Sequence, residues 1–426
     1  MSFGPGLKYA PTAHPNLLYD YTKALKFALS VRIVHTTGGH LNPELRSYMM
    51  STTWRVPFGD LRRSHQAINT ELIAAVKRVI ESGWYILGNE VAAFEQEFAA
   101  ACGVNHCVGV ASGAEALYLA LVAAGIGPGD EVITVANACM YDVAAILQAG
   151  ARPILVDVDP TTQNLDPAAM AAAITPRTRA VIPVHLFGRL ADMAAINDLA
   201  KRHDLVVIED AAQAHGAWRI DSTGQPRQAG QWGDIAAFSF YPTKNLGALG
   251  DGGAVVTNQT SLAERLRRLR MYGWERKYYT TEIGGRNSRL DELQAALLRV
   301  KLAHLAAANA ARRERAGWYA AALADVPIGL PVDEPGHVYH LYVITLPDRV
   351  TRDRLREHLL AHGVGCDIHY PTPTHLQPAY AELGYRAGSL PVTEDLAGRI
   401  LSLPMYPELT YEEVMFVAET VRTGGV

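Results

Sequence analysis

Short apolar runs rich in Val, Ile and Ala recur through the middle of the chain and alternate with segments of helical spacing. These runs cover residues 107–110, 131–135, 152–156, 180–184, 205–208, 236–240 and 253–257. Apolar runs of this length between helical segments are typical of strands that are buried on both faces. Strands that alternate with helices predict an α/β fold, in which a mostly parallel central sheet is flanked by helices.

Helical spacing dominates the chain on both sides of these strands. Between His65 and Ala101 apolar residues recur every three or four positions, with breaks at Ser82-Gly83 and Gly88, which predicts two helices joined by a turn. After the strands, residues 291–323 are rich in Ala, Leu and Arg and predict one long helix. We expect this helix to lead out of the large domain.

The rest of the chain predicts a smaller C-terminal domain of the α+β class. A strand-like run at 340–344 is followed by a helical pattern at 352–362. We therefore divide the ordered chain into a large domain, residues 54–305, and a small domain, residues 306–426.

Residues 1–53 differ from the rest because they show no sustained apolar period and carry scattered Pro, Gly and His. The pattern changes at Trp54. We interpret this segment as an N-terminal extension that is either disordered or the product of a mis-annotated start. In the second case the natural start is Met49 or Met50.

Composition narrows the classes of function. The formal net charge is -4, from 39 basic and 43 acidic residues, so no basic excess predicts a nucleic-acid partner. No apolar stretch is long enough to predict a membrane span, and no export signal is evident. The four cysteines form no CxxC pair, which argues against a metal site or a disulfide framework. We expect a cytoplasmic protein without a metal.

The residues that follow the predicted strands are candidates for chemistry, because parallel sheets bind ligands at the carboxyl ends of their strands. Lys244 follows the strand 236–240 and precedes the glycine-rich loop 247–253. A lysine that is partly desolvated there has a lowered pKa and can form an imine with a carbonyl compound. A solvated surface lysine is the alternative.

Two further segments follow strands in the same way. Asp210 follows the strand 205–208, where a carboxylate could keep a pyridinium nitrogen protonated. Ser112 and Gly113 follow the strand 107–110 and open a helix, a place where backbone N–H groups bind phosphate. Taken alone, Asp210 and Ser112 are equally well explained as ordinary helix N-caps.

Together these segments resemble the DegT/DnrJ/EryC1/StrS family of sugar aminotransferases, which use pyridoxal 5'-phosphate (PLP). The resemblance runs from about Val56 to Val421 and includes five further segments, in the family's order. These segments are Ser82–Gly88, Pro183–Gly188, Gly285–Gln294, His369–Pro371 and Leu403–Pro407. The resemblance implies a fold-type I PLP transferase that forms a homodimer with shared active sites.

The resemblance also implies roles for individual residues. Lys244 matches the lysine that binds the cofactor and moves protons, Asp210 the partner of the pyridine nitrogen, and Gln213 an amide that contacts the ring. The implied phosphate ligands are Ser112, Gly113, Ala114, Ser239 and, from the neighbouring subunit, Asn287. Tyr141 and His185 are candidates for contact with the substrate, although an ordinary half-buried tyrosine and a structural histidine are the alternatives.

The sequence departs from the family pattern at two positions. Cys139 stands where many members place an aromatic residue over the cofactor ring, so the residue that stacks there is open, with Tyr141 as one candidate. Arg286 stands where a tyrosine often precedes the asparagine, which puts the phosphate contacts of that loop in doubt.

The implied reaction moves an amino group from L-glutamate to a keto group of a nucleotide-linked deoxyhexose. The segments Leu269–Trp274 and Asn137–Tyr141 favour members that act at C3, although the choice between C3 and C4 is open. A cyclitol ketone is also possible as the acceptor. The same fold occurs in sugar dehydratases, but Lys244 argues against that activity, because those enzymes carry histidine at this position. A non-catalytic PLP-binding regulator is the remaining possibility.

Overall fold

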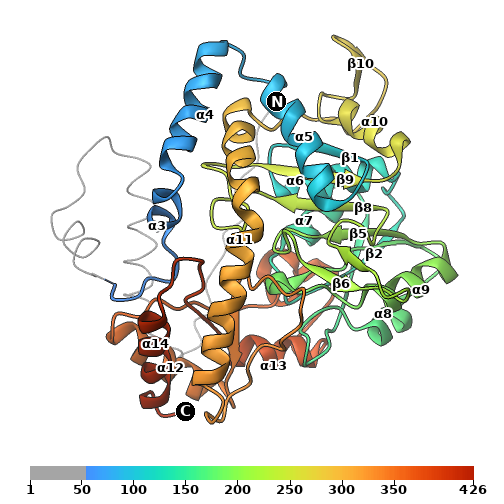
Figure 1. Cartoon of the computed structure of the whole chain (residues 1–426). Helices are drawn as coiled ribbons and strands as arrows, with labels where there is room; N and C mark the ends of the chain where they lie inside the picture. The colour runs from blue at the N-terminus through green and yellow to red at the C-terminus, as the bar shows by residue number, and fades with distance from the viewer. Residues whose placement is uncertain (1–53) are drawn as a thin grey trace, which may run out of the picture. The chain divides into compact units, whose positions relative to one another are not determined.

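The structure is a computed structural model that describes residues 54–426 (Figure 1). Its central sheet has seven strands in the order β1-β9-β8-β5-β4-β2-β3. The interpretation of residues 1–53, with a start at Met49 or Met50, lies outside the described residues. The five strands from β8 to β3 are parallel, whereas β9 is antiparallel to both β8 and β1. The strands are β1 (His106–Val110), β2 (Glu131–Val135), β3 (Arg152–Val156), β4 (Thr178–Val181), β5 (Val206–Asp210), β8 (Ile235–Ser239) and β9 (Gly253–Thr257).

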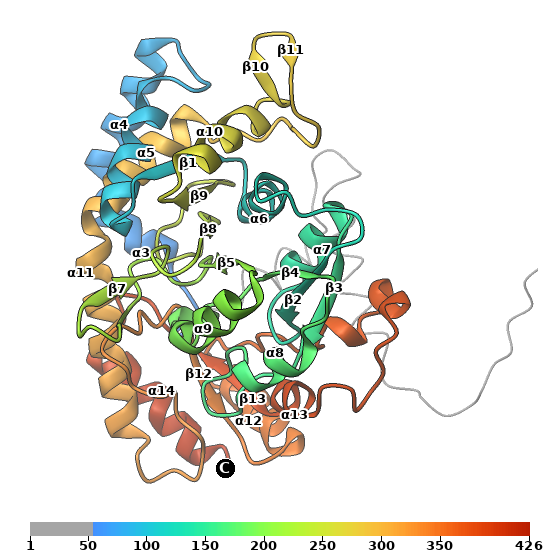
Figure 2. The same ribbon diagram turned by 90° about the vertical axis from the view of Figure 1, so that its right-hand side faces the viewer.

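Helices cover both faces of this sheet, as Figure 2 shows. One face packs against α6 (Gly113–Ala123), α7 (Tyr141–Gln148) and α10 (Thr260–Leu269). The other packs against α5 (Asn89–Cys102), α8 (Pro167–Ala173), α9 (Met193–His203) and α11 (Glu292–Ala322). Each face has its own apolar core, because the side chains of a strand alternate between the two faces. The predicted α/β fold is confirmed.

A third apolar core lies in the C-terminal part of the chain. It combines the end of α11 with an antiparallel pair of strands, and Tyr319 of α11 stacks on Tyr342 of that pair. The elements are β12 (Tyr342–Thr345), β13 (Ile400–Leu403), α12 (Arg349–Ala361), α13 (Pro391–Arg399) and α14 (Tyr411–Thr423). The predicted boundary between residues 305 and 306 falls inside α11, and the division into two domains stays a prediction.

Several small elements differ from the expectation. Besides α4 (Asn69–Ser82) and α5, the N-terminal region contains α3 (Leu61–Gln66), because the Asp60 side chain accepts hydrogen bonds from Arg62 N and Arg63 N and so caps a short helix. Two hairpins and three 3₁₀ turns had no clear apolar signal. They are β6 (Trp218–Ile220), β7 (Pro226–Gln228), β10 (Trp274–Arg276), β11 (Tyr279–Thr280), η1 (Leu186–Gly188), η2 (Thr374–Leu376) and η3 (Pro378–Leu383).

Candidate active site

The fold brings the ends of β1, β5 and β8 to one edge of the sheet, together with the loops that follow them. The start of α6 and the end of β8 come especially close. A Cβ atom built on Gly113 would lie 2.6 Å from the Cβ atom of Ser239. The start of β9 is equally close to the start of α6, since a Cβ atom built on Gly253 would lie 2.3 Å from the carbonyl oxygen of Ser112. Both positions therefore require glycine.

The first turn of α6 offers backbone donors at this point. Ser112 is the N-cap, and its hydroxyl accepts a hydrogen bond from Glu115 N at 3.2 Å. The N–H groups of Gly113 and Ala114 belong to the first turn, so no carbonyl within the helix can accept from them. Together with the helix dipole, they form a site for an anion beside Ser239.

Lys244 lies in the loop after β8, where its own N–H group donates to the carbonyl oxygen of Tyr241 at 2.8 Å. Among residues 54–426 its amino group has neither a hydrogen-bond acceptor nor an ion-pair partner. Burial lowers the pKa of Lys244, and the nearby Asp210 partly opposes this shift. The neutral amine, which is the nucleophilic form, is therefore more populated than in a surface lysine.

Asn245, the next residue, fixes the loop that carries the lysine, a role that the sequence did not indicate. Its side-chain amide donates to Asn309 Oδ1 at 2.9 Å and to the Val338 carbonyl at 3.1 Å, and its Oδ1 atom lies 3.1 Å from His340 Nδ1. These partners belong to α11 and to the segment after it, so distant parts of the chain hold the loop in place. No local pattern could have revealed contacts over such separations.

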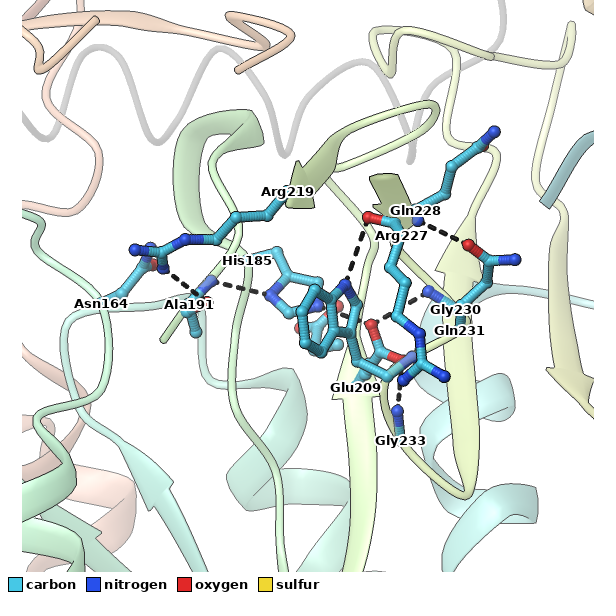
Figure 3. A network of polar contacts seen from close by, with 12 residues as sticks. Asn164, His185, Ala191, Glu209, Arg219, Arg227, Gln228, Gly230, Gln231 and Gly233 are labelled. Carbon is cyan, nitrogen blue, oxygen red and sulfur yellow. Dashed lines mark hydrogen bonds and ion pairs between the residues drawn. The ribbon is translucent and has the colours of Figure 1, made fainter. Parts of the chain in front are cut away.

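Two neighbouring carboxylates, Glu209 and Asp210, stand at the end of β5, and the hydrogen bonds of Glu209 are drawn in Figure 3. Glu209 is fully buried, and its two oxygens accept four hydrogen bonds of 2.7 to 2.9 Å. The donors are His185 Nε2 and the backbone N–H groups of Gly230, Trp232 and Gly233. Glu209 therefore has no capacity left for a ligand.

Asp210 points to the opposite face of the strand, because successive side chains alternate. Its Oδ1 atom accepts from Ala212 N at 2.9 Å. Burial raises the pKa of Asp210, whereas the Ala212 N–H group and the charge of Lys244 lower it. A buried carboxylate with spare acceptor capacity and a lysine nearby suits a positively charged ring nitrogen.

The ring of His185 contacts Glu209, as Figure 3 shows. Its ring is fully buried, Nε2 bonds to Glu209 at 2.8 Å, and Nδ1 accepts from Ala191 N at 3.2 Å. Both nitrogens are thus used within the protein, so the ring offers no polar atom to a substrate. Of the two interpretations of His185, the geometry favours the structural histidine.

Gln213 connects two segments that are far apart in the sequence. Its Oε1 atom accepts from Phe187 N at 2.6 Å, and its Nε2 atom donates to the Tyr370 hydroxyl at 3.2 Å. From the sequence we assigned no chemical role to the segment His369–Pro371. The structure places Tyr370 beside the amide that the resemblance assigns to the cofactor ring.

Cys139 and Tyr141 lie next to each other at the start of α7. Burial raises the pKa of Cys139, whose thiol also lies near Lys244. The Tyr141 side chain is 50% exposed, so part of its ring is free for contact with a ligand.

Comparison with known proteins decides the family. A profile of the DegT/DnrJ/EryC1/StrS aminotransferase family matches residues 66–422. The chain belongs to this family. It is 49% identical over 373 residues to dTDP-3-amino-3,4,6-trideoxy-alpha-D-glucose transaminase of Streptomyces venezuelae, with 87% of this chain and 96% of that protein covered.

A second DegT/DnrJ/EryC1/StrS relative and one solved structure are also similar to this chain. UDP-N-acetyl-3-dehydro-alpha-D-glucosamine 3-aminotransferase of Acidithiobacillus ferrooxidans is 45% identical over 376 residues, covering 88% of this chain and 99% of that one. The crystal structure of DesV from S. venezuelae in complex with a ketimine intermediate superposes with a TM-score of 0.83 at 50% identity, covering 87% and 98%. The fold-type I expectation is confirmed, and the chain is a PLP-dependent aminotransferase.

The residues at the sheet edge fit the cofactor of a DegT/DnrJ/EryC1/StrS aminotransferase. The glycine-lined start of α6 and Ser239 would hold the phosphate, and Asp210 would hold the ring nitrogen. Lys244, whose amino group is not engaged by the described residues, would bind the carbonyl carbon. The close approach at Gly113 supports this fit, since it brings the first turn of α6 directly against Ser239.

Asn287, which the family pattern would direct to a neighbouring subunit, has an exposed side chain. The residues on either side of it contact the same chain: Arg286 bonds to Glu115 at 2.8 Å, and Ser288 Oγ accepts from Ala111 N at 3.3 Å. Arg286 therefore supports the start of α6 from within the subunit, which leaves Asn287 free to face outwards.

A cavity of about 860 Å³ adjoins the lysine loop. Its wall includes Lys244, Asn245, His340 and His369, whereas Asp210 and Ser239 do not line it. Its volume is in the range of small-molecule sites. In the part of the chain from Trp54 onwards, no helix combines the length and the apolar character needed to cross a membrane.

Proposed function

We propose that this enzyme transfers the amino group of L-glutamate to the C3 keto group of a nucleotide-linked deoxyhexose. The observation that supports this most directly is the likeness to two relatives whose names both specify amination at C3, over almost their whole length. One of these relatives carries dTDP and the other UDP in its name, so the nucleotide of the acceptor stays open.

The residues at the site can perform the proton transfers that this reaction needs. PLP, when bound, supplies the carbon that carries the amino group and a ring that withdraws electrons. Lys244 Nζ then removes the α-proton of glutamate and later delivers a proton to C3 of the sugar. Asp210, as an anion, keeps the ring nitrogen protonated, while Gln213 orients the ring.

Ser112, Gly113, Ala114 and Ser239 are proposed to bind the phosphate. Tyr141 is proposed to contact the acceptor, because its side chain is half exposed and it follows closely on Cys139, whose thiol lies near Lys244. We no longer include His185 among the substrate contacts, since both of its nitrogens bond within the protein.

The enzyme is further proposed to act as a cytoplasmic homodimer in which Asn287 completes the partner's phosphate site. The apolar residues Ile73, Ile80 and Trp84, on α4 and just after it, are 60%, 58% and 64% exposed. Since α4 also buries Leu72 and Val79 against its own chain, it has apolar residues on two sides, as expected of a helix at a subunit interface. The four cysteines are free thiols, in keeping with a reducing compartment.

A panel of acceptors tests the proposed reaction. Purified enzyme with PLP and L-glutamate is offered a dTDP-linked 3-keto-6-deoxyhexose, its 4-keto isomer and a cyclitol ketone, and formation of 2-oxoglutarate is followed. We expect the highest kcat/KM with the 3-keto sugar and no turnover by Lys244→Ala. A preference for the cyclitol ketone would refute the proposed acceptor. Failure of glutamate alone to release 2-oxoglutarate would refute the donor and support a non-catalytic regulator.

A further inference from the structure

Arg286, which stands where a tyrosine is common in the family, forms an ion pair with the first turn of α6. Its Nη1 atom donates to Glu115 Oε1 at 2.8 Å and to Gln148 Oε1, at the end of α7, at 3.2 Å. Its guanidinium carbon lies 3.5 Å from the centre of the Tyr118 ring, about one turn further along α6. The guanidinium group is therefore held from three directions, although the Arg286 side chain is 34% exposed.

The loop that carries Arg286 is fastened by other hydrogen bonds besides this ion pair. Arg286 N donates to the Leu269 carbonyl at 2.8 Å, and the Arg286 carbonyl accepts from Tyr272 N at 3.0 Å. The Tyr118 hydroxyl donates to the Gly284 carbonyl at 3.1 Å, which ties the loop to α6 without the arginine side chain. The charge of Arg286 therefore calls for an explanation other than anchoring the loop.

Glu115 places a negative charge beside the proposed phosphate site. It belongs to the same first turn of α6 as Gly113 and Ala114, whose N–H groups are proposed to bind the phosphate. Within one turn the carboxylate and a bound phosphate are separated by roughly 10 Å or less, a range over which charges still interact. Within residues 54–426 the Oε2 atom of Glu115 is buried without a hydrogen-bond donor, and Arg286 is the one cation paired with this carboxylate.

We propose that Arg286 is a positioning residue that neutralises Glu115 and so allows the first turn of α6 to bind the cofactor phosphate. This proposal rests on the phosphate site proposed above. Two anions at one helix N-terminus repel each other and compete for the same partial positive charge. With the guanidinium group on Glu115, the N–H groups of Gly113 and Ala114 keep their attraction for the phosphate. Arg286 itself need not touch the cofactor.

A double-mutant cycle tests the pairing of charges. The affinity for PLP is measured by fluorescence titration of the cofactor-free enzyme for Arg286→Gln, Glu115→Gln and the double variant. We expect Arg286→Gln to bind PLP about tenfold more weakly, because the charge of Glu115 is then left unpaired at the helix end. Glu115→Gln should bind PLP at least as tightly as wild type. The double variant should recover to within about threefold of wild type, because it lacks both charges.

Two comparisons show whether the effect is on the phosphate. Pyridoxal lacks the phosphate, so Arg286→Gln should change the affinity for pyridoxal by less than about twofold. Arg265→Gln is the matched control, because Arg265 pairs with Glu282 at 2.6 Å, is 36% exposed and donates to the Ala123 carbonyl at the other end of α6. This variant should bind PLP as wild type does.

A double variant that binds PLP as weakly as Arg286→Gln would overturn the proposal, because the arginine would then act by holding the structure and not by neutralising a charge. Equal weakening for PLP and pyridoxal in Arg286→Gln would overturn it as well. Ser239→Ala tests the phosphate site without altering the ion pair. If this variant binds PLP as tightly as wild type, the phosphate site itself is wrong. If it weakens PLP and Arg286→Gln does not, the phosphate site stands and the role proposed for Arg286 is wrong.

Discussion

The close packing of α6 against β8 at Gly113 predicts what a single added methyl group does. In Gly113→Ala the new Cβ atom would lie 2.6 Å from Ser239 Cβ and 3.1 Å from Ser239 Cα. Because one of these contacts is with the main chain, a change of rotamer cannot relieve it, and α6 or β8 must shift. Overpacking of this kind costs about 1 to 3 kcal/mol.

Urea unfolding of the cofactor-free protein, followed by circular dichroism, measures this cost, and fluorescence titration with PLP measures affinity. The matched control is Gly317→Ala in α11, where an added Cβ atom has no neighbour within 4 Å. This control should stabilise the protein by up to about 1 kcal/mol, because alanine is the better helix former. Gly113→Ala should destabilise the protein and weaken PLP binding. If it leaves both quantities unchanged, the glycine is not required for the phosphate site and our reasoning about the start of α6 is wrong.

Three further predictions concern residues around Lys244. Asn245→Ala removes three hydrogen bonds that hold the loop carrying Lys244, so kcat should fall about tenfold or more with little change in KM. An unchanged kcat would show that the loop does not need these hydrogen bonds. Glu209→Gln places an amide NH₂ group among buried N–H donors and should lower the free energy of unfolding by about 2 to 4 kcal/mol. Asp210→Asn should abolish transamination at nearly unchanged stability. The reverse pattern would contradict the roles given to the two residues. Burial lowers the pKa of His215 to about 3. Between pH 6.5 and about 3, therefore, the unfolded chain binds a proton at this histidine and the folded chain does not. As the pH is lowered through this range, the free energy of unfolding should decrease by up to about 1.4 kcal/mol per pH unit, and His215→Phe should reduce this slope.

The sequence predicts the centre of the fold well because its signal is local. The strands at 131–135, 152–156 and 253–257 have the predicted bounds, since an unbroken apolar run between polar residues is enough to mark a buried strand. The direction of a strand is not marked in this way. β9 is antiparallel to both of its neighbours, and the connection from β8 through residues 240–252 contains no helix. Nothing in the apolar run of β9 distinguishes it from the parallel strands.

The candidate site has the same division between local and long-range information. The pair Glu209-Asp210 is visible in the sequence, and strand alternation requires that its two carboxylates face opposite ways. Which of them is free depends on the hydrogen-bond donors around each carboxylate. The donors to Glu209 are backbone N–H groups 21 to 24 residues downstream and the ring of His185, which follows β4. Since these donors and acceptors meet only in the folded chain, family resemblance could assign Asp210 a role, but only the structure explains why its immediate neighbour cannot take that role.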